Sequence, residues 1–287
     1  MDLTALSGAG IIALASTALF LLVVKSWHFL ARSASGTHFP DSIMREAAQR
    51  CRDDLARLNR EQSVYLVSAL VFAVIFLIFY LLPPQGMFDE VPQWQLIAVL
   101  VLLVAAAGFV LVRIGHIVLR TRQLSFVRDA NMAVGHALQR ITSNRNRVFH
   151  DVNTHAGVID HVIVGLHGIY TISVIAKKAG RRNTVELDGD QLTFAPGKLT
   201  MSVERSGRRS EQLAREIRKK TGVDVRVRPV IAVPGWEIES QQSSSYLVVN
   251  ERNLPMFTGW KDERDYLLNE DVEAVHKMLT ARCKRNA

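Results

Sequence analysis

Residues 157–178, GVIDHVIVGLHGIYTISVIAKK, hold two short apolar runs on either side of a glycine-containing turn. Such a pattern predicts a β-hairpin. The first run contains an acidic residue, Asp160, where a buried strand normally carries an apolar side chain. Because a buried carboxylate generally requires a metal ion or a partner charge, Asp160 is a candidate functional residue.

Three long apolar segments precede this hairpin. Of the 287 residues, 48% are apolar, and these concentrate in segments 11–30, 64–82 and 96–119. Each segment is close to or above the roughly 20 residues that a helix needs to cross a bilayer. We therefore expect three transmembrane helices. We expect the first to be retained, because the preceding MDLTALSGAG lacks the basic residues of a signal peptide.

The charge of the connecting segments predicts the orientation in the membrane. Residues 31–63 contain six arginines, whereas the connection 83–95 has two acids and no lysine or arginine. By the positive-inside rule, the N-terminus lies outside and everything after about residue 120 is cytoplasmic. The expected location is a bacterial inner membrane, with the lipid bilayer as one partner. Cys51 and Cys283 then face a reducing compartment, so no disulfide is expected.

The linker between the first two expected spans predicts an amphipathic helix capped by Asp41 or Ser42. Its apolar residues recur at helical spacing, at Ile43, Ala47, Cys51, Leu55 and Leu58. The alternatives are a helix that packs on the soluble domain or on its twin in a homodimer, and a solvated helix. The expected division of the chain is a first transmembrane helix with a short outside N-terminus (1–31), the linker helix (32–62), a transmembrane hairpin (63–120), a soluble domain (121–260) and a C-terminal helix (261–287).

The soluble part has a mixed α/β pattern. The expected elements are a helix over 127–141 with Met132, Val134, Leu138 and Ile141 inward, a strand over 147–152, the hairpin, a strand pair around the Asp-Gly turn at 188–190, a helix over 210–221 capped by Gly222, strands within 225–236 and 244–250, and a helix over 271–284. Phosphate-binding glycine loops, a GxSxG elbow and paired CxxC zinc ligands are absent. The histidines at 136, 150, 155, 161 and 167 lack the spacing of a helical metal-binding pair, so no metal site is expected.

Basic residues cluster on the helix that begins near Ser210 and just before it. They are Arg208, Arg209, Arg215, Arg218, Lys219 and Lys220. Such a face is able to follow the phosphate backbone of a nucleic acid. The alternative is a solvated face beside anionic lipid headgroups, which attract juxtamembrane cations.

Six motifs in order give the soluble part a family resemblance. They are AVGHAL (133–138), RVFHDV (147–152), IDHVIVGLHGIY (159–170), SEQLAREI (210–217), VRPVIAVPGW (227–236) and YLVVN (246–250). Over about residues 128–257 the chain resembles the nuclease-related domain (NERD) family. The resemblance implies a fold similar to the PD-(D/E)XK nucleases and restriction endonucleases, with a central mixed sheet flanked by helices.

The resemblance also implies where a nuclease site would lie. The family's catalytic groups are a Glu on the first helix, an Asp in the first hairpin strand and a Glu-x-Lys in the second strand. Asp160 matches the Asp, but Ala137, Ser173 and Ile175 occupy the other three positions. Since one carboxylate is too little charge to hold a hydrolytic metal, the resemblance implies a degenerate site with no cofactor.

Two functions follow as expectations. The first is a membrane-anchored module without catalytic activity, which binds or scaffolds nucleic acid or a protein partner at the cytoplasmic face. The second is a metal-dependent DNA or RNA nuclease with a rearranged site. That site would combine Asp160 with Lys177, further along the second strand, and His136 on the helix, and it would use Mg²⁺.

Overall fold

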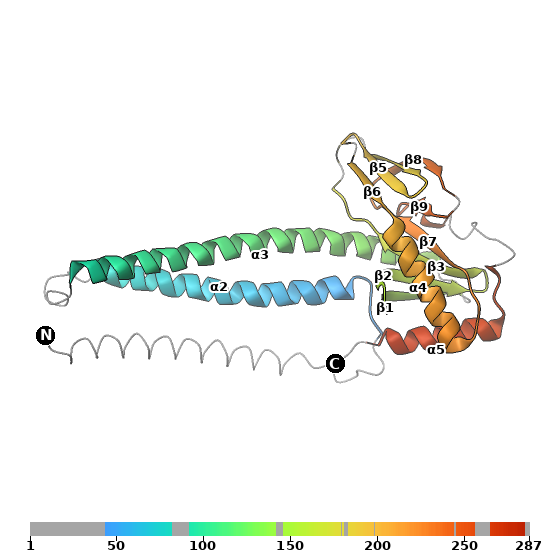
Figure 1. Ribbon diagram of the computed structural model, residues 1–287, viewed down its shortest axis with the longest axis horizontal. Coiled ribbons are helices and arrows are strands. Elements are labelled where there is room, and N and C mark those ends of the chain that lie inside the picture. Colours follow the sequence, from blue (N-terminus) through green and yellow to red (C-terminus); the bar gives the residue numbers. More distant parts are fainter. Residues whose placement is uncertain are drawn as a thin grey trace.

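The computed structural model describes residues 44–81, 92–141, 146–178, 180, 183–197, 199–243, 245–255 and 265–284. The first expected transmembrane segment, the cap at Asp41 or Ser42 and the connection between the second and third expected spans lie outside these residues. Two long helices, α2 (Gln49–Leu81) and α3 (Gln93–Ile141), run side by side away from a mixed α/β domain (Figure 1).

Helix α3 is a single helix of 49 residues. It joins the third expected span to the helix expected at the start of the soluble domain, so the boundary expected at residue 120 falls inside it. The connection between the two parts, residues 119–131, contains no glycine or proline that would end a helix. Val134 and Leu138 are fully buried, as expected for its inward face.

Within the described residues, one helical stretch, Leu100–Arg140, is long and apolar enough to cross a membrane by length and composition. The C-terminal half of helix α2, as far as Leu81, contains the second expected span. By the same criterion of length and composition, α2 is not identified as a membrane-spanning helix. A topology with three spans therefore stays a proposal.

The expected linker helix is not a separate element. Residues from Gln49 onward run without a break into the second expected span. Residues 44–48 are not helical, because Met44 forms a β-bridge with Lys284 and Ala48 has φ of 60°. The side chains of Leu55 and Leu58 are each only 7% exposed, so part of the expected apolar face is covered within this chain.

The first sheet has the strand order β1-β2-β3-β7-β9. Its strands are β1 (Arg147–Thr154), β2 (Gly157–Gly165), β3 (Gly168–Val174), β7 (Val227–Ala232) and β9 (Leu247–Val249). The first three are antiparallel and confirm the predicted hairpin, while β7 and β9 add in parallel. Helices cover both faces, which is why β3 is buried along nearly its whole length.

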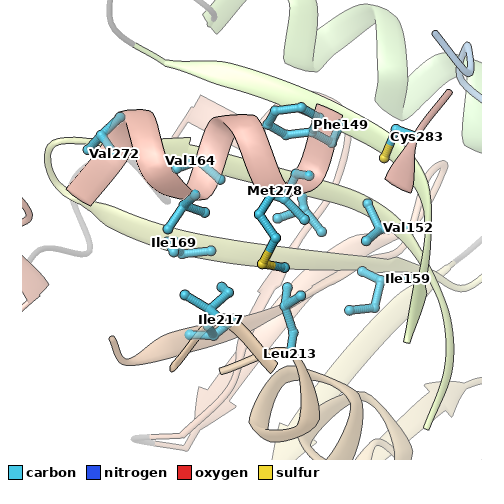
Figure 2. Close-up of a cluster of buried hydrophobic side chains, with 14 residues drawn as sticks. Phe149, Val152, Ile159, Val164, Ile169, Leu213, Ile217, Val272, Met278 and Cys283 are labelled. Carbon is cyan, nitrogen blue, oxygen red and sulfur yellow. The ribbon is translucent and has the colours of Figure 1, made fainter. Parts of the chain in front are cut away.

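One face of this sheet packs on α4 (Glu204–Thr221) and α5 (Asn269–Arg282). Figure 2 shows the resulting core, in which Leu213 and Ile217 of α4 and Met278 of α5 meet strand residues such as Phe149 and Ile159. The other face packs on the end of α3. Helix α4 begins at Glu204, earlier than expected. It ends as predicted at Gly222, whose φ is 78° and whose N–H donates to the carbonyl of Arg218.

A second mixed sheet, which the sequence does not predict, has the order β6-β5-β4-β8. Its strands are β4 (Thr184–Asp188), β5 (Gln191–Ala195), β6 (Leu199–Ser202) and β8 (Glu237–Gln242). The Asp-Gly hairpin between β4 and β5 confirms the prediction at that turn. Between the sheets lies a small core in which the rings of Phe194 and Trp236 meet edge to face, with centroids 4.8 Å apart.

The close approach of α3 to residues 44–48 gives a stability prediction. A Cβ placed on Gly135 would lie 2.5 Å from the Cβ of Ala47, whereas a Cβ on Gly115 of the same helix would have no neighbour within 4 Å. We expect Gly135→Ala to destabilise the protein by about 1–3 kcal/mol through overpacking. Gly115→Ala is the control and should be neutral or stabilising by up to about 1 kcal/mol, since alanine favours a helix. Unfolding in detergent measures both, and equal stability of the two variants would contradict the packing.

Candidate functional site

The hairpin places Asp160 directly across from Ser173. His161 pairs with Ile172, and the next pair in the same antiparallel register is Asp160 with Ser173. The carboxylate Oδ2 of Asp160 accepts the backbone N–H of Val174 at 2.8 Å. The retained acid of the expected nuclease site is thus engaged by its own hairpin.

A second carboxylate, Asp151 on β1, lies near Asp160. Burial raises the pKa of both carboxyls, that of Asp160 to about 6, and the negative charge of Asp151 adds to the rise at Asp160. The backbone of Asp151 has φ of 50°. Its Oδ2 accepts a hydrogen bond from the backbone N–H of Arg50 at 2.8 Å, and its carbonyl oxygen accepts one from the guanidinium of Arg45 at 2.9 Å. Sequence reasoning missed Asp151, although its place at the end of RVFHDV, opposite the hairpin, was a usable signal.

The positions that would complete a nuclease site carry no metal ligands. Ser173 is 7% exposed. Ile175 packs against the core between the two sheets, and Ala137 packs against the core under α3. Among the described residues, no group of three or more His, Cys, Asp or Glu is arranged to hold a metal ion. The two carboxylates alone do not provide the ligand set that metal-dependent phosphodiester hydrolysis needs.

The structure does not bring Lys177 or His136 to Asp160. The Nζ of Lys177 lies over the ring of Phe194, 4.1 Å from its centroid, and desolvation lowers the pKa of this ammonium. His136 is an exposed residue of α3, the helix that covers one sheet face. The positive charge of Arg209, on the helix α4 that covers the opposite face, opposes the rise in the pKa of Asp160 that burial causes. The rearranged site that the sequence suggests stays a hypothesis.

The other described histidines belong to no group of metal-binding side chains. His150 and His161 contact each other through their Nδ1 atoms at 2.8 Å. Burial lowers the pKa of His150 to about 4 and that of His161 to about 3, so both rings are neutral at pH 7. His167 packs edge to face on Tyr266. These contacts are structural.

The basic residues expected to bind nucleic acid fall into two groups. The first group consists of arginines that lie beside other residues of the chain. Arg208 forms an ion pair with Glu204 at 2.6 Å, Arg218 lies 3.7 Å from Asp224, and Arg209 lies over the turn at Gly157. The second group lines a hollow with a cavity volume of about 330 Å³, here named the α4 hollow. Its lining residues are His155, Gln212, Arg215, Glu216, Lys219, Lys220 and Arg282.

The only carboxylate in the lining of the α4 hollow is already neutralised. Glu216 accepts the backbone N–H of His155 and the side-chain amide of Gln212, each at 3.0 Å, and it pairs with Arg282. Burial raises the pKa of Glu216, but these three donors outweigh it and hold the pKa below its usual value. Arg215, Lys219 and Lys220 have no ion pair among the residues that the structure describes. The hollow therefore carries an excess of positive charge.

Comparison with protein family models, with characterised proteins and with solved structures found no match to this chain. The resemblance to NERD proteins therefore stays a hypothesis carried by its motifs.

The raised pKa of Asp160 gives a prediction about stability and pH. A carboxyl whose pKa rises from 3.8 to about 6 on folding binds its proton more tightly in the folded state. Stability is therefore lost as pH rises from about 4 to 6, by roughly 3 kcal/mol in total. Asp160→Asn removes this penalty, so it should stabilise the protein at pH 7.5 and have little effect at pH 4.

Thermal unfolding at both pH values measures this effect. The exposed Asp188, changed to Asn, is the matched control and should show no pH-dependent gain. A loss of stability on Asp160→Asn at pH 7.5 would show that the ionised carboxylate is held by a charge partner or a metal.

Proposed function

We propose that the chain is a membrane-anchored protein with a degenerate NERD-like domain that binds nucleic acid at the cytoplasmic face and does not cleave it. The proposed topology is three membrane spans in a bacterial inner membrane with the N-terminus outside. The single observation that carries the binding role is the α4 hollow, which Arg215, Lys219 and Lys220 line and where none of the three forms an ion pair with a described carboxylate. Phosphate groups are the anions that such a cluster suits.

The length of α3 favours nucleic acid over lipid headgroups as the source of those phosphates. At a rise of about 1.5 Å per residue, the helix from Arg120 to Val134 separates the expected span from the domain core by about 21 Å. Figure 1 shows α4 on the domain, beyond the end of the two long helices. Because the surface potential of a membrane decays within a Debye length of about 8 Å, it contributes little at that distance.

The absence of catalysis rests on the hairpin. Asp160 faces Ser173 of β3, where the family pattern has an acid, and the N–H of Val174 donates a hydrogen bond to the Asp160 carboxylate. The ammonium group of Lys177 lies over the ring of Phe194, so it is not placed to orient an attacking water.

The test measures binding of nucleic acid to the full-length protein in detergent, by fluorescence anisotropy at 50–200 mM salt. We expect binding that weakens with salt, and the double variant Lys219→Ala/Lys220→Ala should weaken it further. Each lost phosphate contact should reduce the slope of log K against log salt by about 0.7–0.9. Arg60→Ala, which removes an exposed cation from α2 instead, is the control and should leave binding unchanged.

Two results would contradict the proposal. One is the absence of salt-dependent binding to DNA or RNA at 50 mM salt. The other is cleavage of either with Mg²⁺ or Mn²⁺ that Asp160→Asn abolishes, since that would show a working metal site at the hairpin.

A further inference from the structure

The α4 hollow is partly open to solvent, and its lining residues come from three parts of the chain. Residues from α4 form one wall, His155 in the turn between β1 and β2 forms another, and Arg282 at the end of α5 forms a third. Its volume of about 330 Å³ is at the lower limit for small-molecule sites and is suited to a group the size of one nucleotide. A face that only followed a duplex backbone would need no such enclosure.

The walls are held together by the neutralised carboxylate. Glu216 accepts hydrogen bonds from the His155 backbone and from the Arg282 guanidinium, so one side chain fixes the turn, α4 and α5 relative to one another. The side chains of Glu216 and Arg282 are 9% and 16% exposed. The hollow is therefore formed before a ligand arrives, which lowers the free-energy cost of binding.

The charge in the hollow is greater than one phosphodiester requires. Arg215 and Lys219 are four residues apart on α4, Lys220 follows Lys219, and all three line the hollow. An internal phosphodiester carries a single negative charge, whereas a phosphomonoester carries about −1.5 to −2 at pH 7. Three cations that converge on one small hollow thus favour the phosphomonoester.

The lining also offers an apolar surface beside the charges. The aliphatic stems of Lys219 and Lys220 and the guanidinium plane of Arg215 can lie against a base or sugar while their charged ends face the phosphate. This combination fits a nucleotide at the end of a strand better than a free inorganic anion.

We infer that the α4 hollow receives the phosphorylated end of a nucleic-acid strand, with Arg215, Lys219 and Lys220 around its terminal phosphomonoester and Glu216–Arg282 as the fixed wall. The inference rests on the proposed function and makes it more specific, since it names the strand end as the ligand.

The experiment compares three single-stranded DNA oligonucleotides of one sequence with the full-length protein in detergent. One carries a 5′-phosphate, one a 3′-phosphate and one has hydroxyls at both ends, and the dye sits on an internal base. At 50 mM salt we expect one phosphorylated form to bind about fivefold or more tightly than the hydroxyl form, because its extra charge lies near three cations. Lys219→Ala/Lys220→Ala should abolish that preference, while the control Arg60→Ala should keep it.

The outcomes separate this inference from the proposed function. Equal, salt-dependent binding of all three oligonucleotides would overturn the strand-end inference and leave nucleic-acid binding intact. No binding of any oligonucleotide would overturn both. Tighter binding to vesicles of phosphatidic acid and phosphatidylcholine than to the phosphorylated oligonucleotide would identify the phosphomonoester as a lipid headgroup and would also overturn the inference.

Discussion

The carboxylate of Asp151 accepts the first-turn N–H of Arg50, and the placement of the domain against α2 depends on this contact. Helix α2 has no acid in its own first turn, so a residue from β1 supplies the cap that helix N-termini need. The backbone of Asp151 also accepts the guanidinium of Arg45, whose own N–H bonds to Cys283 after α5. A few residues therefore connect β1, α2 and α5. The close packing of Gly135 on Ala47 brings α3 to the same place, so both long helices meet the domain at one junction.

Within this frame, each of the two acids at the hairpin accepts a backbone hydrogen bond that joins elements of the fold. Asp151 caps a helix and Asp160 accepts an N–H of the adjacent strand. Both have raised pKa values because burial disfavours their charged forms, and no metal ligand set surrounds them in the part of the chain that the structure describes. The proposed anion site lies instead on α4, at the side chains of Arg215, Lys219 and Lys220.

Local signals predicted much of the fold from the sequence. The glycine turn of the hairpin, the Asp-Gly turn before Gln191 and the Gly222 cap are each set by residues close together in the chain, and the structure confirms them. The second sheet was missed because β6 and β8 are short strands whose side chains are mostly exposed. The start of α2 was missed because its cap comes from Asp151, far away in sequence. The position of Lys177 over Phe194 could not be predicted for the same reason, since it depends on the second sheet.

The basic cluster was predicted, but its division into paired and unpaired cations required the partners Glu204, Asp224 and Glu216.

The central claim is that nucleic acid contacts this protein at the α4 hollow and not at the hairpin acids. Photo-cross-linking of bound oligonucleotide to the full-length protein, followed by mass spectrometry of the cross-linked peptides, tests it most directly. The account predicts cross-links in residues 212–220 and near His155 or Arg282, with none in the strand around Asp160 and Ser173. Cross-links concentrated at Asp160 and Ser173, with residues 212–220 unmodified, would contradict it.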